Sequence, residues 1–202
     1  MPGFKPGEPI ERVVALAASG DERAWREIVD RYARRVFAMA RSRLQNDDLA
    51  EDLTQGVFAT LAEKLPGGAY TEGGAFESWL FRITMNRVRD QARRAKARPT
   101  MLDASETPLA DPQGSGARRP DADPDSLARL RAAMEGLGDA DREVIELRHH
   151  GQMSFQQIAE LTGEPVGTLL ARHHRALRKI RDAMERAASL ASPRPHLSGG
   201  QP

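Results

Sequence analysis

One stretch near the middle of the chain divides it, because the stretch is too polar and too rich in proline to belong to a packed core. It spans residues 98–126 and reads RPTMLDASETPLADPQGSGARRPDADPDS, with five prolines, two glycines and no aromatic residue. Such a segment cannot bury enough apolar surface to offset the entropy it would lose on ordering. We therefore expect a flexible linker at 98–126 between two small domains at 10–97 and 127–187, with disordered ends at 1–9 and 188–202.

The first domain shows helical spacing of apolar residues and no strand-type alternation. Its first stripe, which Asp21 can cap, consists of Trp25, Ile28, Tyr32, Val36 and Met39. A second stripe runs over residues 49–65 and a third over residues 76–88. The three stripes predict helices that close on one another as a small bundle.

The second domain is predicted to contain a helix-turn-helix. Ser154 and Gln157 form a capping box ahead of the short helix FQQIAEL. The turn Thr162-Gly163-Glu164-Pro165 follows, and a longer basic helix begins after it. The whole chain is therefore expected to be all-α, with two small helical domains.

Positive charge is concentrated in two blocks, although the net charge of the chain is only +1. Residues 82–98 hold seven Arg or Lys against one acid, and residues 172–181 hold five against none. Blocks of this kind are typical of a protein that binds a phosphate backbone. The alternative is two solvated helix faces, and a helix-turn-helix can also contact protein rather than DNA.

Polar residues on each basic helix share a face opposite the apolar stripe. On the first helix these are Arg82, Asn86, Arg89 and Arg93. On the second they are Thr168, Arg172, Arg175 and Lys179. Arginine can bridge two acceptors of a guanine edge and an amide can read a base edge, so both faces are candidates for DNA contact.

Several sequence segments resemble the extracytoplasmic-function (group 4) sigma factors of bacterial RNA polymerase. DLAEDLTQGVFATLAEKL with FESWLFRITMNRVRDQARRAKAR resembles their region two, and LGDADREVIELRHHGQMSFQQIAELTGEPVGTLLARHHRALRKIR resembles their region four. The resemblance implies a factor that binds core polymerase, recognises the minus-ten and minus-thirty-five promoter elements and opens the duplex. Its partners would be core polymerase and promoter DNA, and an anti-sigma protein is a further candidate.

The resemblance also assigns residues. The clamp helices of the largest polymerase subunit would be contacted by Glu51, Asp52, Leu53, Gln55 and Phe58. The minus-ten element would be met by Arg82, Asn86, Arg89 and Arg93, and the minus-thirty-five element by Thr168, Arg172, His174, Arg175 and Lys179. Gly56 departs from the family pattern, which implies the loss of a possible clamp contact. Leu170 and Ala171 also depart from it, so binding to the minus-thirty-five element is expected to be weaker or directed to another sequence. His173 replaces a packing leucine and is expected to be buried or semi-buried.

Other functions find little support in the sequence. Neither His149-His150 nor His173-His174 has the i, i+4 spacing of two metal ligands on one helix face, and the chain has no cysteine. No nucleophile, partnered base or phosphate-binding glycine loop is recognisable, so we expect no enzyme activity, no metal and no cofactor.

No run of eighteen apolar residues and no secretory signal is present, and we expect a cytoplasmic protein without membrane contact. The alternative function is a stand-alone helix-turn-helix regulator whose first domain is an interaction module. The sigma-factor interpretation requires the two cationic faces to be accessible, so burial of those faces within one rigid globule would contradict it.

Overall fold

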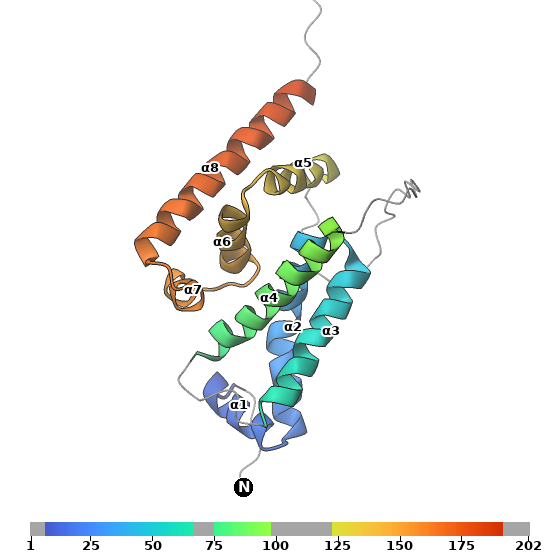
Figure 1. Cartoon of the computed structure of the whole chain (residues 1–202), viewed down its shortest axis with the longest axis vertical. Helices are drawn as coiled ribbons and strands as arrows, with labels where there is room; N and C mark the ends of the chain where they lie inside the picture. Colours follow the sequence, from blue (N-terminus) through green and yellow to red (C-terminus); the bar gives the residue numbers. More distant parts are fainter. Residues whose placement is uncertain (1–6, 67–74, 98–122, 192–202) are drawn as a thin grey trace, which may run out of the picture.

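The computed structural model describes residues 7–66, 75–97 and 123–191, and these residues form helices joined by turns (Figure 1). The first group of helices comprises α1 (Ile10–Ala18), α2 (Glu22–Leu44), α3 (Asp47–Lys64) and α4 (Phe76–Ala97). The second group comprises α5 (Pro124–Glu135), α6 (Asp139–His149), α7 (Phe155–Thr162) and α8 (Val166–Ala191). The prediction of an all-α chain with two helical groups is confirmed.

Side-chain caps fix where several helices begin. Asp21 accepts hydrogen bonds from the backbone N–H groups of Arg23 and Ala24, at 2.8 and 3.1 Å, as its position before α2 predicted. The capping box before α7 is also present, since Ser154 accepts from the Gln157 N–H at 3.1 Å and donates its own N–H to the Gln157 side chain at 2.8 Å.

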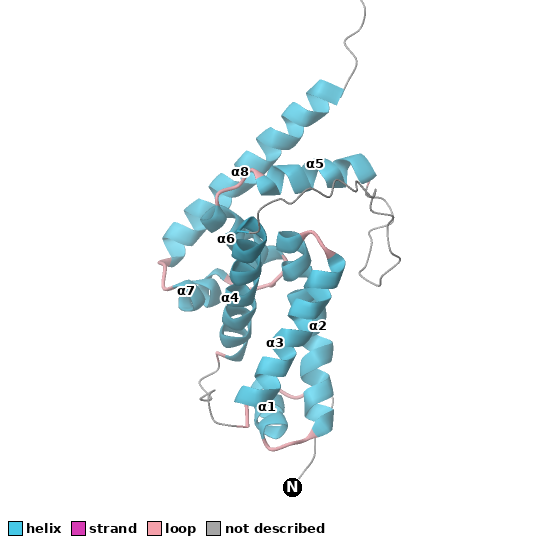
Figure 2. Ribbon diagram, turned by 45° about the vertical axis from the view of Figure 1, so that its right-hand side comes forward, coloured by secondary structure: helices cyan, strands magenta, loops and turns pink. Residues whose placement is uncertain are grey.

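The turn between α7 and α8 has the geometry expected of a helix-turn-helix. Gly163 ends α7 with a φ of 75°, a left-handed conformation that glycine adopts without steric cost. Pro165 stands directly before α8, and its carbonyl accepts from the Leu169 N–H at 3.1 Å. The chain thus turns within a few residues into α8, which runs along the outer edge of the second group and packs against α5 (Figure 2).

The second group begins earlier and ends later than the sequence pattern indicated. Asp123 caps α5 and Pro124 is its first residue, so the helix starts inside the segment expected to be linker. The last helix continues to Ala191, beyond the expected boundary at residue 187. Residues 98–122, which make up most of the expected linker, lie outside the described residues, as do residues 1–6 and 192–202.

A single apolar core runs from the first group into the second. Buried side chains of α1 to α4 continue into a set from the second group: Val144, Leu147, Met153, Ile158 and Leu169. A smaller cluster joins α5, α6 and α8 through Ala133, Leu137, Ile145, Ala176 and Ile180. The two groups therefore pack against each other, with α7 beside α4 (Figure 1), a contact that the sequence pattern did not indicate.

Polar contacts reinforce this joint between the groups. Arg35 of α2 donates from Nε to the carbonyl of Gly151 at 3.0 Å and pairs with Glu77 of α4 at 2.8 Å. Gln157 of α7 donates to the same Glu77 carboxylate at 2.8 Å. Arg142 of α6 donates to the backbone carbonyl of Ser42. Long side chains on both groups thus satisfy backbone and carboxylate acceptors across the joint.

Candidate nucleic-acid interface

The face predicted on α4 exists, because the apolar side of this helix is buried in the core. Phe76, Leu80 and Phe81 are almost fully buried, while Arg82, Asn86, Arg89 and Arg93 are all exposed on the other side. Arg93 forms an ion pair with Asp90 on the same helix. Arg87, on the adjacent side of the helix, donates to Thr60 of α3 at 2.6 Å.

Two of the α4 arginines contact the second group. Arg89 donates to both carboxylate oxygens of Glu143 on α6, one of them at 2.6 Å, and this hydrogen bonding raises the pKa of the guanidinium. Its side chain is 45% exposed, so the pair lies at the edge of the joint. Arg82 donates to the backbone carbonyl of Glu160 on α7 at 3.4 Å. The α4 face is therefore partly covered by α6 and α7.

The face predicted on α8 is more open. Thr168, His174, Arg175 and Lys179 are exposed, and Lys179 pairs with Asp141 of α6 at 2.6 Å. Arg172 is only 18% exposed, because it pairs with Glu164 in the preceding turn at 2.6 Å. The hydrogen bond to Glu164 raises the pKa of Arg172. Neither face is hidden completely, although each carries an arginine that is already paired with a carboxylate.

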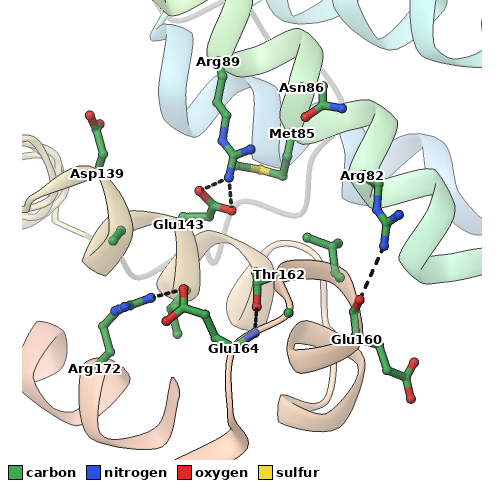
Figure 3. A pocket seen from close by; sticks show the side chains of 14 residues that line it. Arg82, Met85, Asn86, Arg89, Asp139, Glu143, Glu160, Thr162, Glu164 and Arg172 are labelled. Atoms are coloured by element: carbon green, nitrogen blue, oxygen red, sulfur yellow. Dashed lines mark hydrogen bonds and ion pairs between the residues drawn. The ribbon is translucent and has the colours of Figure 1, made fainter. Parts of the chain in front are cut away.

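The two faces meet at a polar cavity of about 760 Å³. Arg82, Asn86 and Arg89 project from α4 on one side, and Arg172 lies on the other (Figure 3). Between them stand the carboxylates of Glu143 and Glu164. Neither acid could be recognised as a partner from the sequence, since a Glu in a helix, like Glu143, or in a turn, like Glu164, gives no sign of which arginine it will pair with.

The face predicted for polymerase contact divides into exposed and buried members. Glu51, Asp52 and Gln55 project from α3 into solvent. Leu53 is 8% exposed and belongs to the core, and Phe58 is half-buried against it. The three polar side chains are thus exposed to a partner and Phe58 is partly accessible, whereas Leu53 supports the helix from the core.

Two acids at the contact between the groups, Glu77 and Glu146, have shifted pKa values. Burial alone would raise the pKa of Glu77, but the hydrogen bond from Arg35 and the charge of Arg35 lower it overall. Burial raises the pKa of Glu146, which is fully buried on α6, against the opposing charges of Arg43 and Arg142. These acids were not singled out from the sequence, because buried charges cannot be distinguished there from exposed ones.

One histidine from each sequence pair meets the other between α6 and α8. The Nε2 atoms of His149 and His173 are 3.1 Å apart, and the rings stack with centroids separated by 5.3 Å. His173 is half-buried, as expected. Within residues 7–66, 75–97 and 123–191 no cluster of three His, Asp or Glu side chains has the geometry to hold a metal ion.

The described part of the chain contains no helix with the length and apolar character needed to span a bilayer.

Family comparisons match residues 28–98 to Sigma-70 region 2 and residues 127–180 to Sigma-70, region 4. The two matched segments carry α4 and α8, respectively, and thus both cationic faces.

Whole-chain comparisons agree with these matches. The chain is 31% identical over 165 residues to the RNA polymerase sigma factor CarQ of Myxococcus xanthus, covering 82% of this chain and 91% of that protein. It is 30% identical over 191 residues to the ECF RNA polymerase sigma factor SigE of Mycolicibacterium smegmatis, covering 92% and 72%. The solved structure of CnrH in complex with the cytosolic domain of CnrY aligns with a TM-score of 0.63 at 25% identity, covering 90% of this chain and 98% of that one.

Proposed function

Since this chain belongs to the extracytoplasmic-function family of bacterial RNA polymerase sigma factors, we propose that it binds core RNA polymerase and directs it to the minus-ten and minus-thirty-five elements of promoters. The observation that carries the proposal is the order of the two matched regions, each with a cationic helix face. Two separate DNA contacts on one chain suit a factor that must grip two spaced elements at once.

The α4 face is assigned to the minus-ten element. Arg82, Arg89 and Arg93 supply guanidinium groups for phosphates, and Asn86 supplies an amide that can read a base edge. A factor that opens DNA must also hold an unstacked base. The contacts that the protein makes with this base offset an unstacking cost of a few kcal/mol. The exposed positions of these four side chains support the assignment.

The α8 face is assigned to the minus-thirty-five element in the major groove. A recognition helix presents its N-terminal residues to base edges, and Thr168 and Arg172 occupy that part of α8. His174, Arg175 and Lys179 follow along the helix, where contacts to bases and to flanking phosphates become available. A helix-turn-helix with a capped α7 and a tight Gly163 turn supports this orientation.

Polymerase contact is assigned to the exposed polar face of α3. Glu51, Asp52 and Gln55 would meet the clamp helices of the largest subunit, with Leu53 and Phe58 shaping the helix beneath them. The mechanism is recruitment and duplex opening, with no covalent chemistry by this chain and no cofactor. Linking two modest DNA contacts raises the effective concentration of the second once the first has formed.

The setting of this function is the bacterial cytoplasm, where core polymerase works. A stand-alone helix-turn-helix regulator is not favoured, because such a protein has no need of the region 2 match across α2, α3 and α4. The solved CnrH structure is a complex with a second protein, the cytosolic domain of CnrY. We extend this to an anti-sigma protein as a candidate regulator of this chain.

Transcription in vitro tests the proposal. The purified chain is mixed with bacterial core polymerase and a library of promoter fragments, and run-off transcripts that depend on the chain are sequenced. We expect a set of transcripts that share two spaced upstream elements. Transcripts that are identical without the chain, or failure of the chain to co-purify with core polymerase, would refute it.

A single substitution tests the proposed contact between Arg172 and the minus-thirty-five element. Arg172→Ala is expected to weaken promoter recruitment by about 1–3 kcal/mol if Arg172 contacts a guanine. Arg186→Ala is the charge-matched control, because Arg186 is exposed on α8 but lies C-terminal to Lys179, the last residue of the proposed contact. Equal transcription by both variants would remove Arg172 from the interface.

A further inference from the structure

The α4 face is occupied by the other half of the same chain. Glu143 holds the Arg89 guanidinium through both carboxylate oxygens, and the Glu160 carbonyl accepts from Arg82. A carboxylate that accepts from the Arg89 Nη2 group in this way takes the place of the phosphate or base-edge acceptors that the same guanidinium would meet on DNA. DNA and α6 therefore cannot both use Arg89.

Apolar packing, in addition to the Arg89–Glu143 ion pair, holds the second group against the first. The apolar core is continuous across the joint, where Val144, Leu147 and Ile158 pack with the buried residues of α1 to α4. Gly151 lies so close to α2 that a Cβ atom built on it would be 3.0 Å from the Met39 methyl carbon. Such a close approach indicates a fitted contact, since loosely touching surfaces leave room for an added methyl group.

Buried charged side chains also stabilise the contact between the two groups. Arg43 of α2 is almost fully buried and lies 3.8 Å from the fully buried Glu146 of α6. Arg142 of α6 reaches the Ser42 carbonyl of α2 and also donates to Glu146 at 2.8 Å. Charged side chains are buried only when they are paired, so these groups are matched to the closed arrangement.

The face assigned to polymerase is exposed in the same arrangement. Glu51, Asp52 and Gln55 are exposed on α3, and α3 lies on the side of the first group away from α7 and α8 (Figure 1). Polymerase can therefore dock on α3 while the α4 face is still covered.

We propose that the free chain is closed on itself, with Glu143 on α6 as an internal competitor for the DNA-binding Arg89 of α4, and that the joint must open before the α4 face can grip DNA. This inference rests on the function proposed above. It adds a sequence of events: the chain docks on polymerase through α3, the second group separates from α4, and the minus-ten strand takes the place of Glu143 and the Glu160 carbonyl.

Matched single variants test the competition. Glu143→Gln removes the charge that holds Arg89. Glu160→Gln makes the same change of charge beside the same cavity but keeps the carbonyl that Arg82 uses, so it serves as the control. The probe is a fluorescein-labelled single-stranded DNA of mixed sequence, with binding measured by fluorescence anisotropy. Because affinity scales with the binding-competent fraction, we expect Glu143→Gln to bind roughly threefold to tenfold more tightly than the control.

A reversible lock tests the same point from the opposite direction. The chain has no cysteine, so Gln45→Cys with Glu135→Cys creates one reactive pair at a place where the residue that follows α2 already contacts α5 through the two native side chains. A cleavable bismaleimide across this pair holds the groups together at a distance from the α4 face. We expect the locked full-length chain to lose DNA binding at least tenfold and to regain it on cleavage of the linker.

A distance measurement shows whether the free chain is closed. Spin labels on cysteines introduced at the exposed positions Glu63 of α3 and Asp182 of α8 should give one narrow distance distribution in the wild-type background and a broader, longer one with Glu143→Gln. Circular dichroism shows whether each variant is folded. If Glu143→Gln unfolds, DNA binding by the cross-linked Gln45→Cys, Glu135→Cys chain tests the proposal instead.

Three results would overturn the proposal: a broad distance distribution in the wild-type background, equal DNA affinity of the Glu143 and Glu160 variants, or full DNA binding by the locked chain. None of these measurements contains polymerase. They can therefore fail while transcription in vitro succeeds, and they can succeed while the chain shows no association with polymerase, so the two proposals are separately testable.

Discussion

Replacement of Gly151 by alanine tests the packing around this residue, which lies between the end of α6 and α2. The added Cβ atom would lie 2.6 Å from the Leu147 carbonyl oxygen and 3.0 Å from the Met39 methyl carbon. The methionine end can move by a few tenths of an ångström, but the carbonyl belongs to the last turn of α6. The backbone at Gly151 does not have a positive φ, so the expected effect comes from crowding alone.

The magnitude follows from the cost of inserting one carbon into a packed site, about 1–3 kcal/mol of unfolding free energy. For a protein of this size one kcal/mol corresponds to roughly 2–4 °C, so we expect Tm to fall by roughly 2–12 °C. Thermal unfolding followed by circular dichroism measures the change.

Gly167→Ala is the matched control. Gly167 lies in the first turn of α8, and no atom is within 4 Å of the position that its Cβ would take. The same substitution should therefore stabilise the protein by roughly 0.5–1 kcal/mol through helix propensity alone. If Gly151→Ala were as stable as the wild type while Gly167→Ala behaved as expected, the close approach at Gly151 would be wrong.

Three further predictions concern other parts of the molecule. Burial lowers the pKa of both His149 and His173, so the unfolded chain binds more protons than the folded chain below the ordinary histidine value of about 6.5. The free energy of unfolding should therefore fall as the pH decreases through this range. Urea unfolding at pH 7.5 and 5.5 should show a smaller pH dependence for His173→Leu, and an unchanged dependence would argue against this cause. Gly56→Ala places a Cβ atom 2.9 Å from Nη1 at the far end of the long Arg87 side chain, which can shift by a few tenths of an ångström while Nη2 keeps its hydrogen bond to Thr60. Urea unfolding should therefore show a gain of at most about 1 kcal/mol, and a loss would contradict this. Arg175→Ala should reduce the slope of log K against log salt for promoter binding by about 1 if Arg175 neutralises a phosphate, whereas an identical slope would place Arg175 outside the interface.

Local patterns in the sequence were sufficient for the helices and for the two candidate faces. The stripe from Trp25 to Met39 became α2, and Ser154 with Gln157 formed the capping box, because both depend on residues three or four apart. The start of α5 was missed by a few residues, since Asp123 and Pro124 were counted with the proline-rich segment although they are also a helix start signal.

The contact between the groups could not be predicted in the same way. Arg35 and Gly151 are 116 residues apart in the chain, and no periodicity links an arginine to a distant carbonyl. Arg142, Glu143 and Glu146 looked like ordinary exposed residues of a charged helix, yet all three are buried because each has a partner of opposite charge or a carbonyl acceptor. Burial of charge depends on tertiary pairing, which the pattern of one chain does not contain.

The Arg35 contacts have a consequence for hybrid proteins built from related factors. Arg35 reaches the second group through the main-chain oxygen of Gly151, and every residue type supplies that oxygen, so an exchanged C-terminal half would preserve this anchor wherever its loop follows the same path. Glu77 and Gln157 meet through side chains, so that link survives only when both halves come from compatible parents. Chimaeras that restore a Glu and Gln at these two places should accordingly be easier to produce in soluble form than those that restore only one.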